Sequence, residues 1–191
     1  MGEPTNIALK EWSILCAELA AGRQVILLKK GGIHDRRKEF EMDHHAFFLF
    51  PTYYHAKAED VVPGARAELE RLTAEAPPES EVHLSVYCTV HGAKFVEDVA
   101  TLGKLEGQHV YSDHTIDTRY NYRRPGLWVV TVRASVLPAP VVVSNTEEYA
   151  GCVSWVSLDE AIDPGEAAPA LSDEAFTERI AAVEKIIGKF A

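Results

Sequence analysis

Cysteine is scarce in this chain, which has only Cys16, Cys88 and Cys152 among its 191 residues. The three are far apart and odd in number, which excludes a framework of disulfide bonds and a Cys-x-x-Cys zinc site. All three lie in apolar patterns, so they are predicted to be small buried hydrophobic side chains. Their scarcity fits a reducing compartment, and we therefore expect a cytoplasmic protein.

Long hydrophobic runs are also missing. No apolar segment reaches the roughly 18 residues that a membrane span requires, and no basic and then apolar leader precedes Ile7. We therefore expect no membrane partner. Internal repeats and low-complexity tracts are absent from the sequence as well. With 47% hydrophobic and 25% charged residues, the composition is that of an ordinary globular protein, and the length suits one domain.

Positive charge is in short supply, because the formal net charge of the chain is −10. A net negative charge by itself argues against nucleic-acid binding. The distribution of charge qualifies that argument. Residues 23–38 carry +5 and residues 119–133 carry +4, which leaves −19 for the rest of the chain. If the two basic segments fold together, they form a local anion-binding face. If they are separate loops, they are ordinary solvated surface charge.

The hydrophobic patterns predict an α+β domain. Helices are predicted over 7–21, over 113–121 after the cap residue Ser112, and over 173–190 after Ser172. Apolar strands are predicted at 24–29, 46–50, 82–90, 127–137, 140–144 and 152–157. Because strands and helices do not alternate regularly, we expect a curved mixed or antiparallel sheet, or a small barrel, flanked by an N-terminal and a C-terminal helix. Residues 1–158 would form the α+β domain, 159–171 a linker, and 172–191 a helix packed on the same domain.

Polar residues gather where two predicted strands end, in LLKKGGI at 27–33 and FFLFPTYYH at 47–55. They are Lys29, Lys30, Gly31, Gly32, Thr52 and His55. Paired glycines permit positive φ or a close approach to the backbone, so backbone N–H groups and ammonium groups could face an anion here. A tight turn with exposed lysines is the alternative.

Aromatic and basic residues are interleaved between Tyr111 and Trp128. The segment also contains Tyr120, Tyr122, Arg119, Arg123 and Arg124. Aromatic rings among arginines can stack on bases while the arginines neutralise phosphates. The alternative packs the rings inside and leaves the arginines to cap a helix.

Catalytic signatures are weak. His44, His45 and His55 lie within twelve positions and Asp43 is nearby, but residues 44 and 45 point to opposite sides of a strand. The arrangement nearest to a PD-(D/E)xK nuclease motif is Asp43 followed by His55-Ala56-Lys57. It is a poor match, because His55 stands where the motif requires a second acidic residue. The P-loop, HExxH and GxSxG motifs are absent. The sequence therefore assigns no catalytic residue and no cofactor, and it leaves a metal site at Asp43, His44, His45 and His55 as an alternative to hydrogen-bonded or exposed histidines.

Several ordered motifs resemble a bacterial family known as domain-of-unknown-function family 1802, over about residues 8–158. They are ALKEW at 8–12, LLKKGGI at 27–33, FxLFPTYxH at 47–55, LxxLxxxHVYS at 102–112, Arg119 with Tyr120, LWVVTVR at 127–133 and YAGCVSWVSL at 149–158. This chain has Lys29-Lys30 where the family usually has Arg-Lys, and His55-Ala56 where it has His-Gln. Some members occur beside a restriction-endonuclease domain, so the resemblance implies a link to restriction–modification or other DNA-related work.

Three functions remain open at this point. The leading hypothesis is a protein that binds nucleic acid or another phosphate-bearing ligand through Lys29, Lys30, Gly31, Gly32, Arg119, Arg123 and Arg124, assisted by Thr52 and His55. The second is a metal-dependent hydrolase or nuclease. The third is a protein–protein interaction module, homo-oligomerisation included, whose acidic C-terminal helix docks on a partner or on a second copy.

Overall fold

A computed structural model describes residues 2–30, 44–149, 151 and 154–190. Within these residues the strands form one mixed sheet with the order β2-β5-β4-β3-β1-β6, and β7 pairs with β5. The strands are β1 (Thr5–Trp12), β2 (Ile26–Lys29), β3 (Ala46–Thr52), β4 (Glu81–Val96), β5 (Leu127–Ser144), β6 (Trp155–Ile162) and β7 (Ala168–Pro169). The β1–β3 pair is parallel, and the other strand pairs of the described chain are antiparallel.

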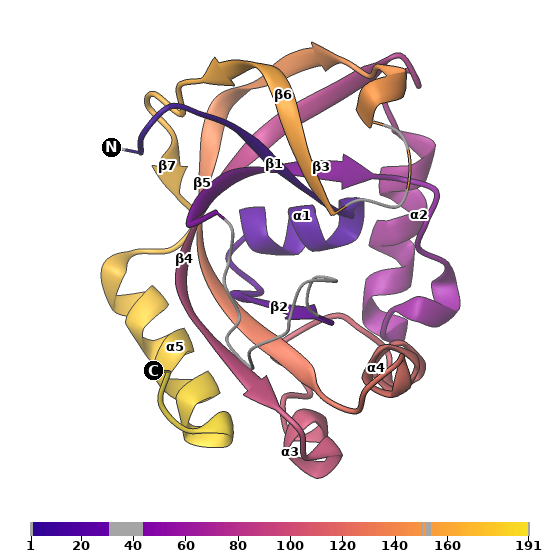
Figure 1. The fold of residues 1–191 in the computed structure, drawn as a ribbon, viewed down its shortest axis with the longest axis vertical. Coiled ribbons are helices and arrows are strands. Elements are labelled where there is room, and N and C mark those ends of the chain that lie inside the picture. Colours follow the sequence, from indigo (N-terminus) through magenta and orange to yellow (C-terminus); the bar gives the residue numbers. More distant parts are fainter. Residues whose placement is uncertain (1, 31–43, 150, 152–153, 191) are drawn as a thin grey trace.

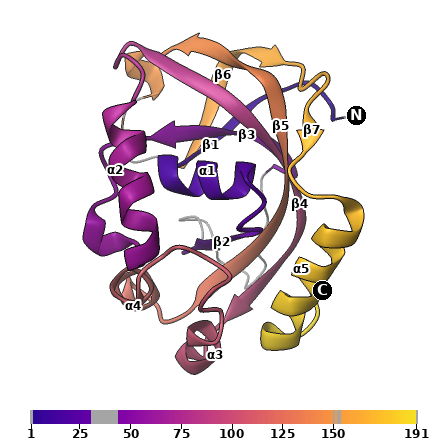
Figure 2. The same ribbon diagram turned by 180° about the vertical axis from the view of Figure 1, so that it is seen from behind.

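Helices cover the sheet and fill its curve. They are α1 (Ser13–Ala20), α2 (Arg66–Ala74), α3 (Val99–Gly103), α4 (Asp113–Asn121) and α5 (Asp173–Ile187), with short 3-10 turns η1 (Ala58–Asp60), η2 (Pro63–Ala65) and η3 (Glu147–Tyr149). Helix α1 lies in the hollow of the sheet, α2 and α4 lie on one side, and α5 lies on the other (Figures 1 and 2). The predicted α+β domain with a curved sheet is confirmed, and in the described part of the chain that sheet is open, with β2 and β6 at its two ends.

The helix predicted over residues 7–21 is wrong in its first half. Thr5–Trp12 is a strand, and the helix begins only at Ser13. Ala8 and Leu9 are both buried, and β1 lies between β3 and β6 in the sheet. Because consecutive residues of a strand point to opposite faces, β1 is covered on both faces at this point, and apolar residues on both faces also fit a helical pattern. Pairing with β3 and β6 decides the outcome.

Two boundaries also differ from the prediction. Residues 127–137 and 140–144 form a single strand, and its Pro138 and Pro140 lie next to a register shift between Leu84 and Val86 of β4. Such an irregularity tolerates residues that cannot donate to the ladder. The expected linker at 159–171 contains the end of β6 and all of β7.

Helix α5 packs on the domain through its apolar face. The Ser172 hydroxyl accepts a hydrogen bond from the Ala175 amide at 3.2 Å, as a helix cap does. The buried side chains of the helix are Phe176, Ile180, Val183 and Ile187, which join the same core cluster as residues of α1, α2 and β2. Across the described residues, the structure contains no helix long and apolar enough to cross a membrane.

Candidate functional site

Three strands end at one place in the fold. Strands β1 and β3 run parallel with Trp12 opposite Thr52, and the Thr52 hydroxyl donates a hydrogen bond to the Glu11 carbonyl at 3.1 Å. The Lys29 ammonium, at the end of β2, forms an ion pair with the Glu11 carboxylate. Because β2 and β1 are far apart in the strand order, only the curvature of the sheet brings them together. We call the following set the strand-end cluster: Glu11, Trp12, Lys29, Thr52, Tyr111 and Arg119.

The acid of this cluster is buried. The Glu11 side chain is 4% exposed and that of Lys29 is 21% exposed. Because successive side chains of a strand point to opposite faces, Glu11 shares a face of β1 with Leu9, and Lys29 shares a face of β2 with Leu27. The sequence analysis missed Glu11 because it placed this residue on a helix. Had residues 5–12 been assigned to a strand, the alternation with Leu9 would have shown that Glu11 points inward and needs a cationic partner.

Arg119 caps the edge strand β2. Its Nη1 donates a hydrogen bond to the Leu28 carbonyl at 3.0 Å, and the Tyr111 hydroxyl accepts one from the Leu28 amide at 3.4 Å. The guanidinium lies 4.6 Å from the Trp12 ring centroid and 4.9 Å from that of Tyr111. Burial is the main cause that raises the pKa of Tyr111, so its phenol stays protonated. Arg119 and Tyr111 therefore satisfy backbone groups that a sheet edge would leave unpaired.

Lys30 holds the turn that follows α4. Its ammonium donates hydrogen bonds to the carbonyls of Tyr120 at 2.6 Å, Gly126 at 3.0 Å, and Arg124. Three carbonyls match the three donors of an ammonium group. Burial, and then the charge of Arg124, lower the pKa of Lys30. We call residues 120–126 the pinned turn, because a lysine from a remote strand fixes three of its carbonyls.

The pinned turn presents an aromatic ring and a guanidinium to solvent. Tyr122 is 55% exposed, and the guanidinium of exposed Arg123 lies 5.0 Å from its ring centroid. Arg123 has a backbone φ of +62°. Among the residues that the structure describes, it is the non-glycine residue in the left-handed region. Arg124 lies over the Phe95 ring and forms an exposed ion pair of 3.0 Å with Glu97.

The predicted site residues thus form two adjoining groups. Lys29, Thr52 and Arg119 meet in the strand-end cluster, and Lys30, Arg123 and Arg124 meet at the pinned turn. His55 is exposed in the bend after β3, and among the described residues no hydrogen bond or ion pair joins it to either group. Gly31 and Gly32 lie outside the described residues.

The alternative metal site stays a prediction. Asp43 lies outside the described residues, His45 is exposed, and the His44 ring packs edge-on against Trp155 with centroids 5.1 Å apart. Among the residues that the structure describes, no three metal-ligating side chains gather into a site.

His109 packs against Tyr111 of the strand-end cluster, and the centroids of the two rings are 5.5 Å apart. Burial lowers the pKa of His109 to about 4. A histidine that binds its proton more weakly when folded favours unfolding as pH falls through its unfolded pKa of about 6.5. We therefore expect the free energy of unfolding to fall by about 2 kcal/mol between pH 7 and 4.5 because of this residue alone, at 1.36 kcal/mol per pKa unit.

Urea unfolding at both pH values checks this expectation. His109→Gln should lose about 2 kcal/mol less than the wild type between pH 7 and pH 4.5. His114→Gln, at an exposed histidine on α4, is the matched control and should lose as much as the wild type. Equal acid sensitivity of His109→Gln and His114→Gln would contradict the assignment.

Comparisons with known proteins add a family and one distant structure. A family model described as domain of unknown function (DUF1802) matches residues 8–182. The match runs past residue 158, where the sequence resemblance was expected to end, and into α5. A search of curated proteins finds no match. A crystal structure of a mutant ZmASCH protein from Zymomonas mobilis is similar at 11% identity with a TM-score of 0.40, over 94% of this chain and 98% of that one.

Proposed function

The chain belongs to the DUF1802 family, and we propose that it binds a phosphate-bearing ligand, single-stranded nucleic acid, through the exposed side of the pinned turn. Tyr122 would stack on a base, and Arg123 would contact the backbone phosphate beside it. Arg119 and Arg124 would add positive potential beside them, whereas the charge of Lys29 is neutralised by Glu11. Such binding fits a role in DNA- or RNA-linked processes.

The backbone at Arg123 is the observation that carries the proposal. A left-handed conformation costs a residue with a Cβ about 1–2 kcal/mol, and such strain is found at functional sites more often than elsewhere. Here Lys30 stabilises it through the surrounding carbonyls. The result is a rigid turn that holds a guanidinium over an exposed tyrosine ring. Aromatic platforms with neighbouring cations are what proteins use to bind single strands without a fixed sequence.

Charge distribution supports the same face. Residues 119–124 carry three arginines and no acidic residue in a chain whose net charge is −10. Acidic residues elsewhere repel a polyanion, so they confine it to the basic segment. Arg124 has an acidic partner, Glu97, but that ion pair is exposed, with side chains 54% and 69% accessible. Exposed pairs are weak, so a phosphate can replace the carboxylate.

Fluorescence anisotropy with a labelled single-stranded oligonucleotide tests the proposal. Arg123→Gly removes the guanidinium and, because glycine tolerates positive φ, leaves the turn unstrained. We expect this variant to fold at least as stably as the wild type and to bind several-fold more weakly. The slope of log affinity against log salt should also shrink by about 1.

Tyr122→Leu isolates the stacking contribution and should weaken binding about fivefold or more, since one stacked base contributes about 1–3 kcal/mol. Lys185→Gln, an exposed lysine on α5 at the other side of the molecule (Figure 1), removes the same charge as Arg123→Gly and should leave affinity nearly unchanged. If Arg123→Gly and Lys185→Gln bind alike, the pinned turn is not the binding surface.

A further inference from the structure

A cavity lies beside the ends of β1 and β3, next to the strand-end cluster. It is on the strand face that carries Leu49 and Pro51, the register partners of Leu9 and Glu11. Its volume is about 280 Å³. Thr52 contacts the Glu11 backbone, whereas its neighbours Pro51 and Tyr53 line the cavity. This division follows from strand geometry, because alternate side chains point to opposite faces. The full lining is Ser13, Cys16, Ala17, Ala20, Leu49, Pro51, Tyr53, Leu72, His83, Ser85, Val86 and Pro140.

From this cavity we infer a binding site for an uncharged, ring-containing small molecule that carries at least one hydrogen-bonding group. The inference is independent of nucleic-acid binding at the pinned turn, since no residue of that turn lines the cavity.

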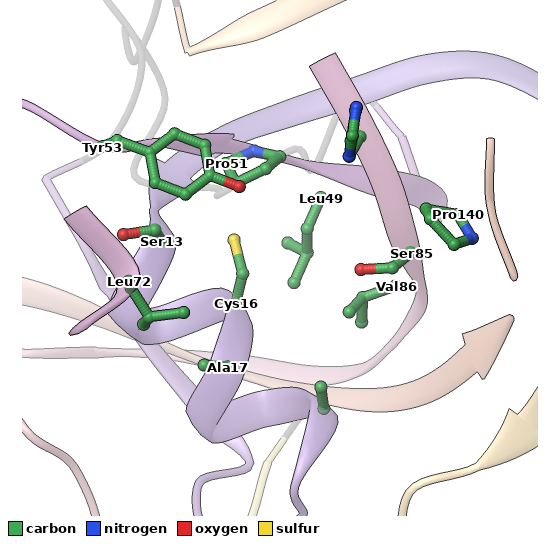
Figure 3. A pocket seen from close by; sticks show the side chains of 12 residues that line it. Ser13, Cys16, Ala17, Leu49, Pro51, Tyr53, Leu72, Ser85, Val86 and Pro140 are labelled. Carbon is green, nitrogen blue, oxygen red and sulfur yellow. The ribbon is translucent and has the colours of Figure 1, made fainter. Parts of the chain in front are cut away.

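The size of the cavity supports a ring. An apolar protein cavity of about 150 Å³ accommodates benzene. A space of about 280 Å³ therefore fits a substituted ring or a bicyclic molecule. Ala17 and Ala20 form the wall on α1, and their small side chains leave that space open. Pro51 of β3 and Tyr53, just after the strand, form the facing wall (Figure 3).

Charge and polarity select an uncharged ligand with hydrogen-bonding groups. The described lining residues include no lysine, arginine, aspartate or glutamate, and the imidazole of the lining residue His83 is already hydrogen-bonded to Glu81 at 3.0 Å. A charged ligand would therefore be desolvated without a free partner. The Tyr53 hydroxyl, the Cys16 thiol and the Ser85 hydroxyl project toward the space around Leu49 (Figure 3). Burial is the main cause that raises the pKa of Tyr53, so its phenol remains a neutral hydrogen-bond donor.

Benzamide, benzoate and benzylammonium test the inference, because the three share one ring and differ in charge. Protein NMR follows the methyl groups of Leu49, Leu72 and Val86 during titration, and the Leu102 methyls, in another part of the core, serve as the reference. We expect benzamide to shift the cavity methyls with a Kd of about 1 mM or below, a modest affinity for a ligand of its size. Both charged analogues should bind at least tenfold more weakly.

Filling the cavity provides the decisive variant. Ala17→Leu should weaken benzamide binding at least tenfold, and Ala181→Leu, at an exposed alanine on α5, should leave it unchanged. Should Ala17→Leu fail to fold, Ala20→Leu fills the same wall. The inference is overturned if 10 mM benzamide shifts no cavity methyl, if the charged analogues bind as well, or if the folded filled variant still binds.

Discussion

Replacing Lys29 by methionine is expected to lower the free energy of unfolding by about 3 kcal/mol. The substitution leaves the Glu11 carboxylate, 4% exposed, without its cationic partner. Removing one member of a buried ion pair typically costs about 3–5 kcal/mol, because an uncompensated charge remains inside the protein. Lys29 is 21% exposed, so water can reach part of the site, and we expect the lower end of that range.

Urea denaturation of a double-mutant cycle measures this effect. Glu11→Gln removes the charge that Lys29 neutralises, so the double variant Glu11→Gln/Lys29→Met should be more stable than Lys29→Met alone. Lys185→Met, at an exposed lysine on α5, should change stability by less than about 0.5 kcal/mol. A loss below about 1 kcal/mol in Lys29→Met would show that the ion pair does not stabilise the strand ends.

Replacing Tyr111 by alanine is expected to cost about 3–5 kcal/mol, the range for removal of a buried aromatic side chain. Tyr111 is 1% exposed, and its ring contacts Trp12 with centroids 6.0 Å apart and the Arg119 guanidinium at 4.9 Å. Its loss would leave a cavity and remove one of the two rings that hold Arg119.

Tyr111→Phe separates the ring from the hydroxyl. This variant keeps the packing and deletes only the acceptor of the 3.4 Å hydrogen bond from the Leu28 amide. A single hydrogen bond of this kind contributes about 0.5–1.5 kcal/mol. Comparable losses in the phenylalanine and alanine variants, measured by urea denaturation, would mean that the hydroxyl and not the ring stabilises the cluster.

Local signals in the sequence predicted the helices that have their own caps. Ser112 accepts a hydrogen bond from the Thr115 amide at 3.2 Å, and α4 spans Asp113–Asn121 as predicted. Helix α5 begins after Ser172 in the same way. Such predictions succeed because a cap and an amphipathic stripe are encoded within a few neighbouring residues.

Residues 7–12 show where local signals stop. Their side chains are compatible with helix or strand, and the strand forms because β3 and β6 lie on either side. The consequence reaches the candidate site, since a strand orients Glu11 inward toward Lys29. No residue near position 11 in the sequence encodes that partner.

The partners of the lysine and arginine side chains were likewise decided by the tertiary structure. The sequence predicted one face that includes Lys29, Thr52 and Arg119, and the structure brings these three to one place. The other predicted members that the structure describes, Lys30, His55, Arg123 and Arg124, lie outside that cluster. The sequence could not predict that Lys30 donates to three carbonyls of a turn some ninety residues away along the chain. Nor could it predict that Arg119 caps β2, or that the guanidinium of Arg123 lies over the ring of an exposed tyrosine.

By itself, the sequence determined the fold class, the capped helices and the segments rich in positive charge, because propensity, capping and composition act between close neighbours in the chain. Only the tertiary structure decided which charges are paired inside the protein and which remain exposed. That division depends on how strongly the sheet curves, because the curvature sets the distance between β2 and β1. Curvature is a property of all the packed strands and helices together, and no short segment specifies it.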